Sequence, residues 1–452
     1  MVSMVREGAV SPSELVRAHL QQIANRDPGL NAFTVLFAET ATEEARAREE
    51  ASAHGEPMGL LHGIPLTVKD SFDIAGVPTL VGSRLRAGHQ AAADAGAVAR
   101  LRVAGAIILG KTNTPELLAS YETDNFITGR TNNPWDVERT PGGSSGGEAA
   151  AIAAFCSPGG IGSDGGGSIR VPAHFCGIAG LKPTPGRIPA SGHFPSLGYP
   201  AGLTTVVGPM ARSAEDLRLL FSALVGYDPQ DPFSAPLPIT EPAIQDLRIG
   251  VWEQFYDVPV DPEIRAALRK AAHALERARF GVEKFEPRGL ERAPNVWAFL
   301  FNQWPSLATR KLIQGREDEA HWTLLESLIT KPVTAEQVLV NLAARDSLRS
   351  ALLRQMDPAL SKPAALLMPV CGIAAFRHRE RRFEIEGRQI GLFQAMMPAV
   401  IANVLGLPAV TIPITKSSEG LPIGVQLVGR PFEDELLLEL AVQLERWMAP
   451  TV

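Results

Sequence analysis

The chain has 452 residues, of which 45% are hydrophobic and 20% charged, and its formal net charge is −6. This composition is typical of a globular protein that buries a large core. The excess of acidic residues argues against nucleic acid as a partner, because binding to phosphates requires a basic surface. The three cysteines are few and odd in number, so we expect a reducing compartment and no disulfide framework.

The first elements follow from capping patterns and periodicity. Residues 1–15 carry early charges and no apolar run of signal-peptide length. Ser11 and Glu14 stand at the N-cap and N3 positions of a capping box and predict a helix start. Residues 39–53 predict a helix with a charged face, residues 64–69 alternate as in a strand, and residues 106–109 predict a short buried strand.

Later elements indicate parallel strand pairing. Residues 247–252 predict a strand, a helix follows from Asp261 to a stop at Gly281, and residues 282–286 predict the next strand. A strand–helix–strand unit of this kind implies parallel pairing. Residues 288–362 look mostly helical and carry no chemistry that we recognise.

One segment, residues 395–415, is nearly uncharged and about long enough to span a bilayer. Three prolines and Asn403 interrupt it, so we predict a buried helix, a turn and a buried strand instead. A strand and an amphipathic helix then end the chain. We therefore expect a soluble, cytoplasmic protein with no membrane partner.

Together these elements predict an α/β fold in which helices cover both faces of one large mixed β-sheet. The sequence shows no internal repeat and no long low-complexity linker. We therefore expect a single domain over residues 1–452.

Two adjacent serines stand between two glycine pairs in "PGGSSGGEAAA", residues 141–151. Ser145 and Glu148 fit the S-x-x-E pattern of a capping box, with an alanine-rich helix behind them. This pattern gives Ser145 a structural role and leaves Ser144 without one. Ser144 would stand just before a helix amino terminus, where negative charge is favoured.

A second glycine–serine cluster follows in "GSDGGGSIR", residues 162–170. Three glycines before Ser168 allow a nest of backbone N–H groups that could hold an oxyanion or a phosphate. The phosphate alternative lacks the lysine of a phosphate-binding loop. The 24 positions between Ser144 and Ser168 leave room for one helix and a short return, so the two serines could meet.

A serine nucleophile needs a base, and Lys69 is the candidate. It ends the apolar strand "IPLTV", and burial in a covered sheet would lower its pKa. Lowering a lysine pKa from about 10.4 to near 7 costs about 4 kcal/mol, which marks such a residue as functional. His174 is nearer to a cluster, but packing or polar support fits it better.

These motifs carry a family resemblance. The stretches "GIPLTVKDSFDIAG", "ILGKTNTPE", "NPWD", "GGSSGGEAAA" and "GSDGGGSIRVPAHFCGIAGLKPTPGRIP" resemble the amidase signature family. The match is dense over residues 10–215 and resumes at "GLPIGVQLVGRP" near the carboxy terminus. The resemblance implies one amidase signature domain with a motif core at about 60–215 and a variable helical region at about 288–362.

The resemblance also implies a Ser–cis-Ser–Lys triad. Ser168 matches the nucleophile, Ser144 the bridging serine after a cis peptide bond, and Lys69 the neutral base. The family's oxyanion hole uses backbone N–H groups that lead into the nucleophile, here those of Gly165, Gly166, Gly167 and Ser168. The reaction would pass through an acyl-enzyme, with no cofactor and no metal.

The sequence departs from the family at Gly165, where a threonine is common. The segment after "KTNTPE" borders the acyl pocket in the family, and the residues it supplies here are Leu117, Leu118, Ser120 and Tyr121. Residues 295–305 could add an aromatic wall or form an ordinary core helix, and Arg170 matches a structural ion pair. We expect a small-molecule substrate, an apolar acyl or aryl amide, with esters and carbamates as further candidates. The physiological substrate and a homo-oligomeric state stay open.

Three alternatives remain. An α/β-hydrolase esterase would fit G-x-S-x-G in "GGSSG", but it needs a strand before the serine and a downstream histidine such as His378. Within the family, the chain could be the amidase-type component of a glutamine-dependent tRNA amidotransferase, which passes ammonia to its partners in a complex. The third alternative is a binding protein without catalytic activity on the same scaffold.

Overall fold

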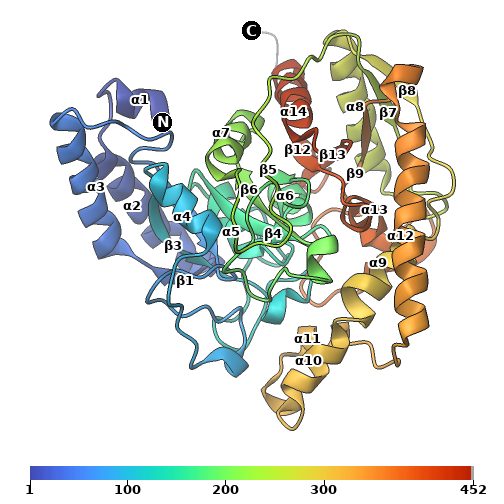
Figure 1. Cartoon of the computed structure of the whole chain (residues 1–452), viewed down its shortest axis with the longest axis horizontal. Helices are drawn as coiled ribbons and strands as arrows, with labels where there is room; N and C mark the ends of the chain where they lie inside the picture. The colour runs from blue at the N-terminus through green and yellow to red at the C-terminus, as the bar shows by residue number, and fades with distance from the viewer. Residues whose placement is uncertain (449–452) are drawn as a thin grey trace.

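The computed structural model describes residues 1–448, and its centre is one mixed sheet of eleven strands within that range (Figure 1). The order across the sheet is β1-β3-β2-β4-β6-β5-β12-β13-β9-β7-β8. The strands are β1 (Phe33–Leu36), β2 (Pro65–Lys69), β3 (Ile107–Thr112), β4 (Gly159–Asp164), β5 (Ala179–Lys182), β6 (Val206–Ala211), β7 (Arg248–Val251), β8 (Gly281–Lys284), β9 (Ala365–Pro369), β12 (Ala409–Lys416) and β13 (Pro422–Val428).

Parallel pairs lie toward both edges of the sheet. β2 pairs in parallel with β3 and β4, and β7 pairs in parallel with β8 and β9. The strands between these groups are antiparallel, from β4–β6 through β12–β13 to β13–β9. The predicted α/β class, the mixed sheet and the parallel strand–helix–strand unit are confirmed.

Helices cover both faces, and the alternation of side chains along a strand separates two kinds of contact. In β13, Val425 and Leu427 belong to the apolar cluster that contains α7 (Ala214–Leu224), α8 (Pro262–Arg277) and α14 (Asp434–Met448). Gln426 between them instead hydrogen-bonds Arg170 of α6 (Arg170–Cys176). The sheet face under α6 therefore carries a polar, hydrogen-bonded side chain, and the candidate site lies on that face.

The amino-terminal helices form where the sequence predicts them. α2 (Pro12–Leu30) begins with the complete capping box: Glu14 N–H donates to Ser11 Oγ at 3.2 Å, and Ser11 N–H donates to Glu14 Oε2 at 2.8 Å. α3 (Ala38–Ala53) matches the charged-faced helix. The strand expected at residues 106–109 is longer than predicted, because β3 continues through Gly110 to Thr112.

The apolar segment near the carboxy terminus is a buried helix, a turn and a strand, as predicted. α13 (Leu392–Val404) contains Pro398, and β12 begins five residues after that helix ends. Among residues 1–448, no helix is long and apolar enough to cross a membrane.

The chain between β8 and β9 is helical and flanks the sheet (Figure 1). α9 (Ala293–Trp297) runs directly into a π-helix, η4 (Ala298–Gln303), and contacts α13. α10 (Ser306–Ile313), α11 (Trp322–Ser327) and α12 (Ala335–Gln355) follow, and the hairpin β10 (Arg382–Ile385) and β11 (Arg388–Gly391) precedes α13.

Candidate active site

Lys69 is the last residue of β2, and its side chain is fully buried. Its Nζ donates to Ser144 Oγ at 2.7 Å and to Ser163 Oγ at 3.0 Å. β2 places the amine there because it runs between β3 and β4 in a sheet covered on both faces. The expected burial of Lys69 and its contact with Ser144 are both present.

Burial lowers the pKa of Lys69 from 10.5 to about 7, against the opposing charges of Asp164 and Glu148. The amine donates to hydroxyls, and no carboxylate of the described residues lies within ion-pair distance of it. In a large fraction of the molecules Lys69 is therefore a neutral amine at pH 7. A neutral amine can accept a proton.

The turn before α5 (Gly146–Ala153) presents Ser144. Gly142 has a φ of 88°, and the Gly143–Ser144 peptide bond is cis. A Cβ atom at position 143 would lie 2.4 Å from the Ser120 carbonyl oxygen, so only glycine fits there. Ser144 itself is 1% exposed and faces Lys69.

The capping box predicted for Ser145 and Glu148 is wrong. Ser145 stands at the N-cap of α5, but its side chain makes no cap hydrogen bond. The Glu148 carboxylate instead accepts from Thr67 Oγ1 at 2.5 Å and from Thr112 Oγ1 at 2.7 Å. Burial raises the pKa of Glu148 to about 7. Glu148 therefore ties α5 to β2 and β3 and adds a titratable group near Lys69.

Ser168 stands between β4 and α6 and is 9% exposed. Its carbonyl accepts a hydrogen bond from the Ser145 N–H at 3.1 Å. This bond joins the two glycine–serine turns that carry Ser144 and Ser168.

Asp164 organises the loop that leads to Ser168. Its carboxylate accepts from the N–H of Gly167 at 2.7 Å and from Arg170 Nη2 at 3.0 Å. Burial alone would raise the pKa of Asp164, but Arg170 and the other donors hold that pKa well below its usual range. Arg170 thus forms the structural ion pair that the resemblance implies.

The three glycines of the loop differ in the use of their N–H groups. The N–H of Gly167 already donates to Asp164 Oδ1 at 2.7 Å. Among residues 1–448, no group accepts a hydrogen bond from the N–H of Gly165, Gly166 or Ser168. These three amides are available to a ligand oxygen.

The segment expected to border the acyl pocket lies against the same loop. Tyr121 donates its hydroxyl to the Gly166 carbonyl at 2.7 Å, and the Ser120 hydroxyl accepts from the N–H of Glu122. Leu117 and Leu118 have positive φ values of 49° and 63°, and Leu117 packs beside α10 and α11 residues. Tyr121 is the member in direct contact with the loop.

Aromatic rings cover the glycines before Ser168. Trp297 stacks on Phe301 with centroids 4.9 Å apart and on Phe393 with centroids 5.9 Å apart. A Cβ atom at position 165 would lie 2.3 Å from Phe301 Cε2. Phe301 therefore fills the space that a threonine at position 165 would need.

The histidines make other contacts. His174 is buried, with Nε2 near the Ile373 carbonyl and Nδ1 accepting from the Gly424 N–H. Both ring nitrogens therefore form hydrogen bonds with the backbone. His378 contacts Glu122, and the residues before Ser144 form a loop, which does not fit a nucleophile elbow. No group of three potential ligands for a metal occurs within the described part of the chain.

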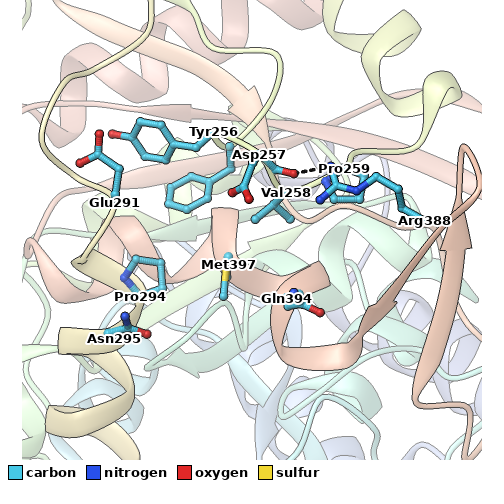
Figure 2. A pocket seen from close by; sticks show the side chains of 11 residues that line it. Tyr256, Asp257, Val258, Pro259, Glu291, Pro294, Asn295, Arg388, Gln394 and Met397 are labelled. Atoms are coloured by element: carbon cyan, nitrogen blue, oxygen red, sulfur yellow. Dashed lines mark hydrogen bonds between the residues drawn. The ribbon is translucent and has the colours of Figure 1, made fainter.

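A separate cavity of about 210 Å³ lies between α9, α13 and the loop after β7 (Figure 2). Asn295, Gln394 and Met397 line it, and Arg388 nearby donates to the Asp257 carbonyl at 2.6 Å. It contains none of Lys69, Ser144, Ser168 and the glycines predicted for the oxyanion hole.

Sequence reasoning missed Ser163 as a partner of Lys69 and the contact of Tyr121 with the loop. Ser163 lies directly before Asp164 on β4, and strand alternation could have placed it beside Lys69 only if the β2–β4 register were known. No sequence signal marked the Tyr121 contact.

The chain is similar to known proteins over nearly its whole length. A family model described as Amidase matches residues 14–438. A glutamyl-tRNA(Gln) amidotransferase subunit of Moorella thermoacetica is 33% identical over 463 residues, covering 97% of this chain and 93% of that protein. The indoleacetamide hydrolase of Bradyrhizobium diazoefficiens is 33% identical over 447 residues, covering 98% and 84% respectively.

Solved structures of similar fold include an acylamidase and a hydrolase. A bacterial aryl acylamidase of the amidase signature family has a TM-score of 0.88 at 26% identity, covering 99% of this chain and 95% of that one. A 6-aminohexanoate cyclic dimer hydrolase in complex with substrate has a TM-score of 0.86 at 31% identity, covering 99% and 96%.

The fold and the family match define an amide-hydrolysing enzyme. The chain belongs to the amidase signature family.

Proposed function

We propose that the protein hydrolyses carboxylic amides through an acyl-enzyme on Ser168, with Lys69 as the base and Ser144 as the relay. The observation that carries this proposal is the 2.7 Å hydrogen bond between the buried Lys69 amine and Ser144 Oγ. Burial without a carboxylate partner disfavours the charged form of this lysine, and its hydrogen bond to Ser144 places the amine where it can exchange a proton with that hydroxyl.

In the first half-reaction, neutral Lys69 takes a proton from Ser144 while Ser144 takes the proton of Ser168. The Ser168 oxygen attacks the carbonyl carbon and forms a C–O bond. The C–N bond then breaks, and the relay returns the proton to the leaving nitrogen. In the second half-reaction, water gives its proton to the relay, attacks the ester carbon and releases the carboxylic acid, and Ser168 recovers its proton.

The tetrahedral intermediate carries an oxyanion, and the amides of Gly165, Gly166 and Ser168 are its proposed donors. They are the N–H groups of this loop that have no acceptor among the described residues. Such donors stabilise charge that develops in the transition state.

We propose apolar acyl or aryl amides as substrates, with esters and carbamates as further candidates. The aromatic rings of Phe301 and Phe393 support this choice, since they flank Trp297 beside the loop and Phe393 is 37% exposed. Leu117, Leu118, Ser120 and Tyr121 would line the opposite side of the acyl pocket.

The test is hydrolysis of a panel of acyl anilides by the purified protein, extended to esters and carbamates. Wild-type protein should release the amine, and Ser168→Ala should lose turnover by several orders of magnitude. A phosphonyl fluoride should label Ser168 in the wild type. Wild-type turnover in the Ser168→Ala variant would remove Ser168 as the nucleophile.

A second candidate is a glutamine-hydrolysing component of a larger complex, because several similar proteins are glutamyl-tRNA(Gln) amidotransferase subunits. This function would need partner chains to receive the ammonia. Glutaminase activity that exceeds every anilide rate, with ammonia transferred only after those partner chains are added, would favour it over the first proposal.

A further inference from the structure

Four successive carbonyl groups of the loop before Ser168 each accept a hydrogen bond from a different part of the fold. Asn403 of α13 donates to Asp164 O at 3.0 Å, and Trp297 of α9 donates its indole N–H to Gly165 O at 2.7 Å. The Tyr121 hydroxyl donates to Gly166 O at 2.7 Å, and the N–H of Val171 donates to Gly167 O at 2.7 Å.

These contacts fix the directions of the N–H groups. In a planar trans peptide the C=O and the following N–H point in opposite directions, and the cis bonds of the described chain lie elsewhere. The Tyr121 contact on Gly166 O agrees with this rule, because the N–H of Gly167 then reaches Asp164. By the same rule, Trp297 turns the N–H of Gly166 away from its own ring.

We propose that Trp297 is a positioning residue for the oxyanion hole: its indole N–H holds the Gly165–Gly166 peptide so that the Gly166 N–H faces the reacting carbonyl. The inference rests on the proposed function of Ser168. Hydrogen bonding at a carbonyl also polarises the peptide and strengthens the donor at its other end.

The packing around Trp297 supports this role. The residue is 4% exposed and lies between Phe301 and Phe393, so its ring cannot turn freely. A Cβ atom at Gly166 would lie 2.4 Å from Trp297 Cζ2, so the glycine allows the ring to lie against the loop. Trp297 ends α9 where the π-helix η4 begins, and π-helical turns are frequent at functional sites.

The experiment compares Trp297→Phe with a matched control, Trp252→Phe. Trp252 is 2% exposed and belongs to the same apolar cluster as Trp297, but its indole nitrogen has no hydrogen-bond partner in the described residues. Both variants lose one buried indole N–H and keep an aromatic ring. Only Trp297→Phe removes a donor from the loop.

We expect kcat/KM of Trp297→Phe for an acyl anilide to fall about tenfold, which is the size of one neutral hydrogen bond. The inhibition constant of a trifluoromethyl ketone with the same acyl group should rise by the same factor, because the ketone forms an oxyanion on Ser168. In a Ser168→Ala background the dissociation constant of the intact anilide should change less than twofold. Trp252→Phe should change none of these values by more than twofold.

Three results would overturn the proposal. Trp297→Phe could leave kcat/KM and the inhibition constant within twofold of wild type, or lower kcat/KM without weakening the ketone. It could also weaken binding of the intact anilide by the full factor, which would make Trp297 a wall of the substrate pocket alone. If Trp297→Phe does not fold, benzothienylalanine at position 297, which replaces N–H by sulfur and keeps the ring shape, gives the same comparison. An active Ser168→Ala variant would instead refute the proposed function, whereas an inactive one beside an unaffected Trp297→Phe refutes this inference alone.

Discussion

Two buried lysines lie on neighbouring strands and have opposite surroundings. Lys111 of β3 forms an ion pair with Asp70 at 2.7 Å and also donates to the Pro78 carbonyl at 2.9 Å. Lys69 of β2 donates to the hydroxyls of Ser144 and Ser163 and, at 3.5 Å, to the Ser163 carbonyl, and it forms no ion pair. Both side chains are 0% exposed, so burial alone does not distinguish them.

The different partners of Lys111 and Lys69 give the two buried lysines different roles. Burial also lowers the pKa of Lys111, but the paired Asp70 carboxylate opposes this shift, and removal of the lysine would leave that buried carboxylate without a partner. Burial lowers the pKa of Lys69 to about 7, because no carboxylate lies close enough to form an ion pair with the amine. Lys111 is therefore a structural residue, and Lys69 is suited to proton transfer.

The largest expected effect comes from Lys69→Met. We expect kcat for an amide to fall by about 10³-fold or more, because the relay loses its base. The free energy of unfolding at pH 7 should not fall, because the variant no longer buries an ionisable amine. Steady-state kinetics and urea unfolding at pH 7 measure the two quantities.

The sign of the stability effect depends on pH. The pKa of Lys69 is about 7 in the folded chain and 10.5 in the unfolded chain, so the unfolded state holds more protons between these values. Wild-type stability therefore rises with pH in that window. The advantage of Lys69→Met should be greatest below pH 7 and disappear by about pH 10.5. A Met variant that unfolds more easily than wild type at pH 6 would contradict the account.

Lys111→Met should have the opposite effects, with a large loss of stability and a small change in kcat. Loss of the partner of Asp70 should lower the free energy of unfolding by about 3–5 kcal/mol. The folded fraction should keep kcat within tenfold of wild type. A double variant with Asp70→Asn should recover part of the stability, as a double-mutant cycle in urea would show. Equal free energies of unfolding for wild type and Lys111→Met would contradict the structural role of Lys111.

The sequence could identify Lys69 but not its contrast with Lys111. The motif around Lys69 and the apolar strand before it predicted burial, and both glycine–serine turns were recognised. The predicted end of β3 at residue 109 left Lys111 outside the strand, because Gly110 weakens a strand pattern. Contacts between distant segments, such as Thr67 and Thr112 with Glu148, depend on sheet register, which local patterns do not determine.

The fold class was predictable because it depends on patterns that are local in the sequence. Strand periodicity and the strand–helix–strand unit specify layers and parallel pairing, and these are local features. The aromatic contacts of Trp297 with the loop join segments 132 residues apart. Residues 295–305 fitted a core helix as well as an aromatic wall, and only tertiary packing distinguishes the two.

A smaller effect should follow from Glu148→Gln. The negative charge of Glu148 raises the pKa of Lys69, so its removal should move the rising limb of the pH profile of kcat/KM to lower pH. Glutamine keeps one oxygen that can accept from the hydroxyl of Thr67 or Thr112, and its NH2 group can donate to the other hydroxyl oxygen. A limb that moves to higher pH would mean that Glu148 does not act on Lys69 through its charge.

The smallest effect is expected for Lys182→Met. Burial also lowers the pKa of Lys182 to about 7, but its amine donates to the Pro183 carbonyl at 3.0 Å. It contacts no serine of the proposed triad, so kcat should stay within twofold of wild type. If kcat of Lys182→Met fell as far as kcat of Lys69→Met, contact with Ser144 would not be what distinguishes Lys69 from other buried lysines with a low pKa.

The central claim is that Lys69 acts as a free amine near neutral pH. The most direct test is the rate constant for labelling of Ser168 by a phosphonyl fluoride, measured as a function of pH in wild type and in Lys69→Met. We expect a wild-type rate that rises to a plateau with a midpoint near pH 7, and a slow rate without this midpoint in the variant. A wild-type midpoint near 10.5, the ordinary value for lysine, or the same profile in both proteins would contradict this claim.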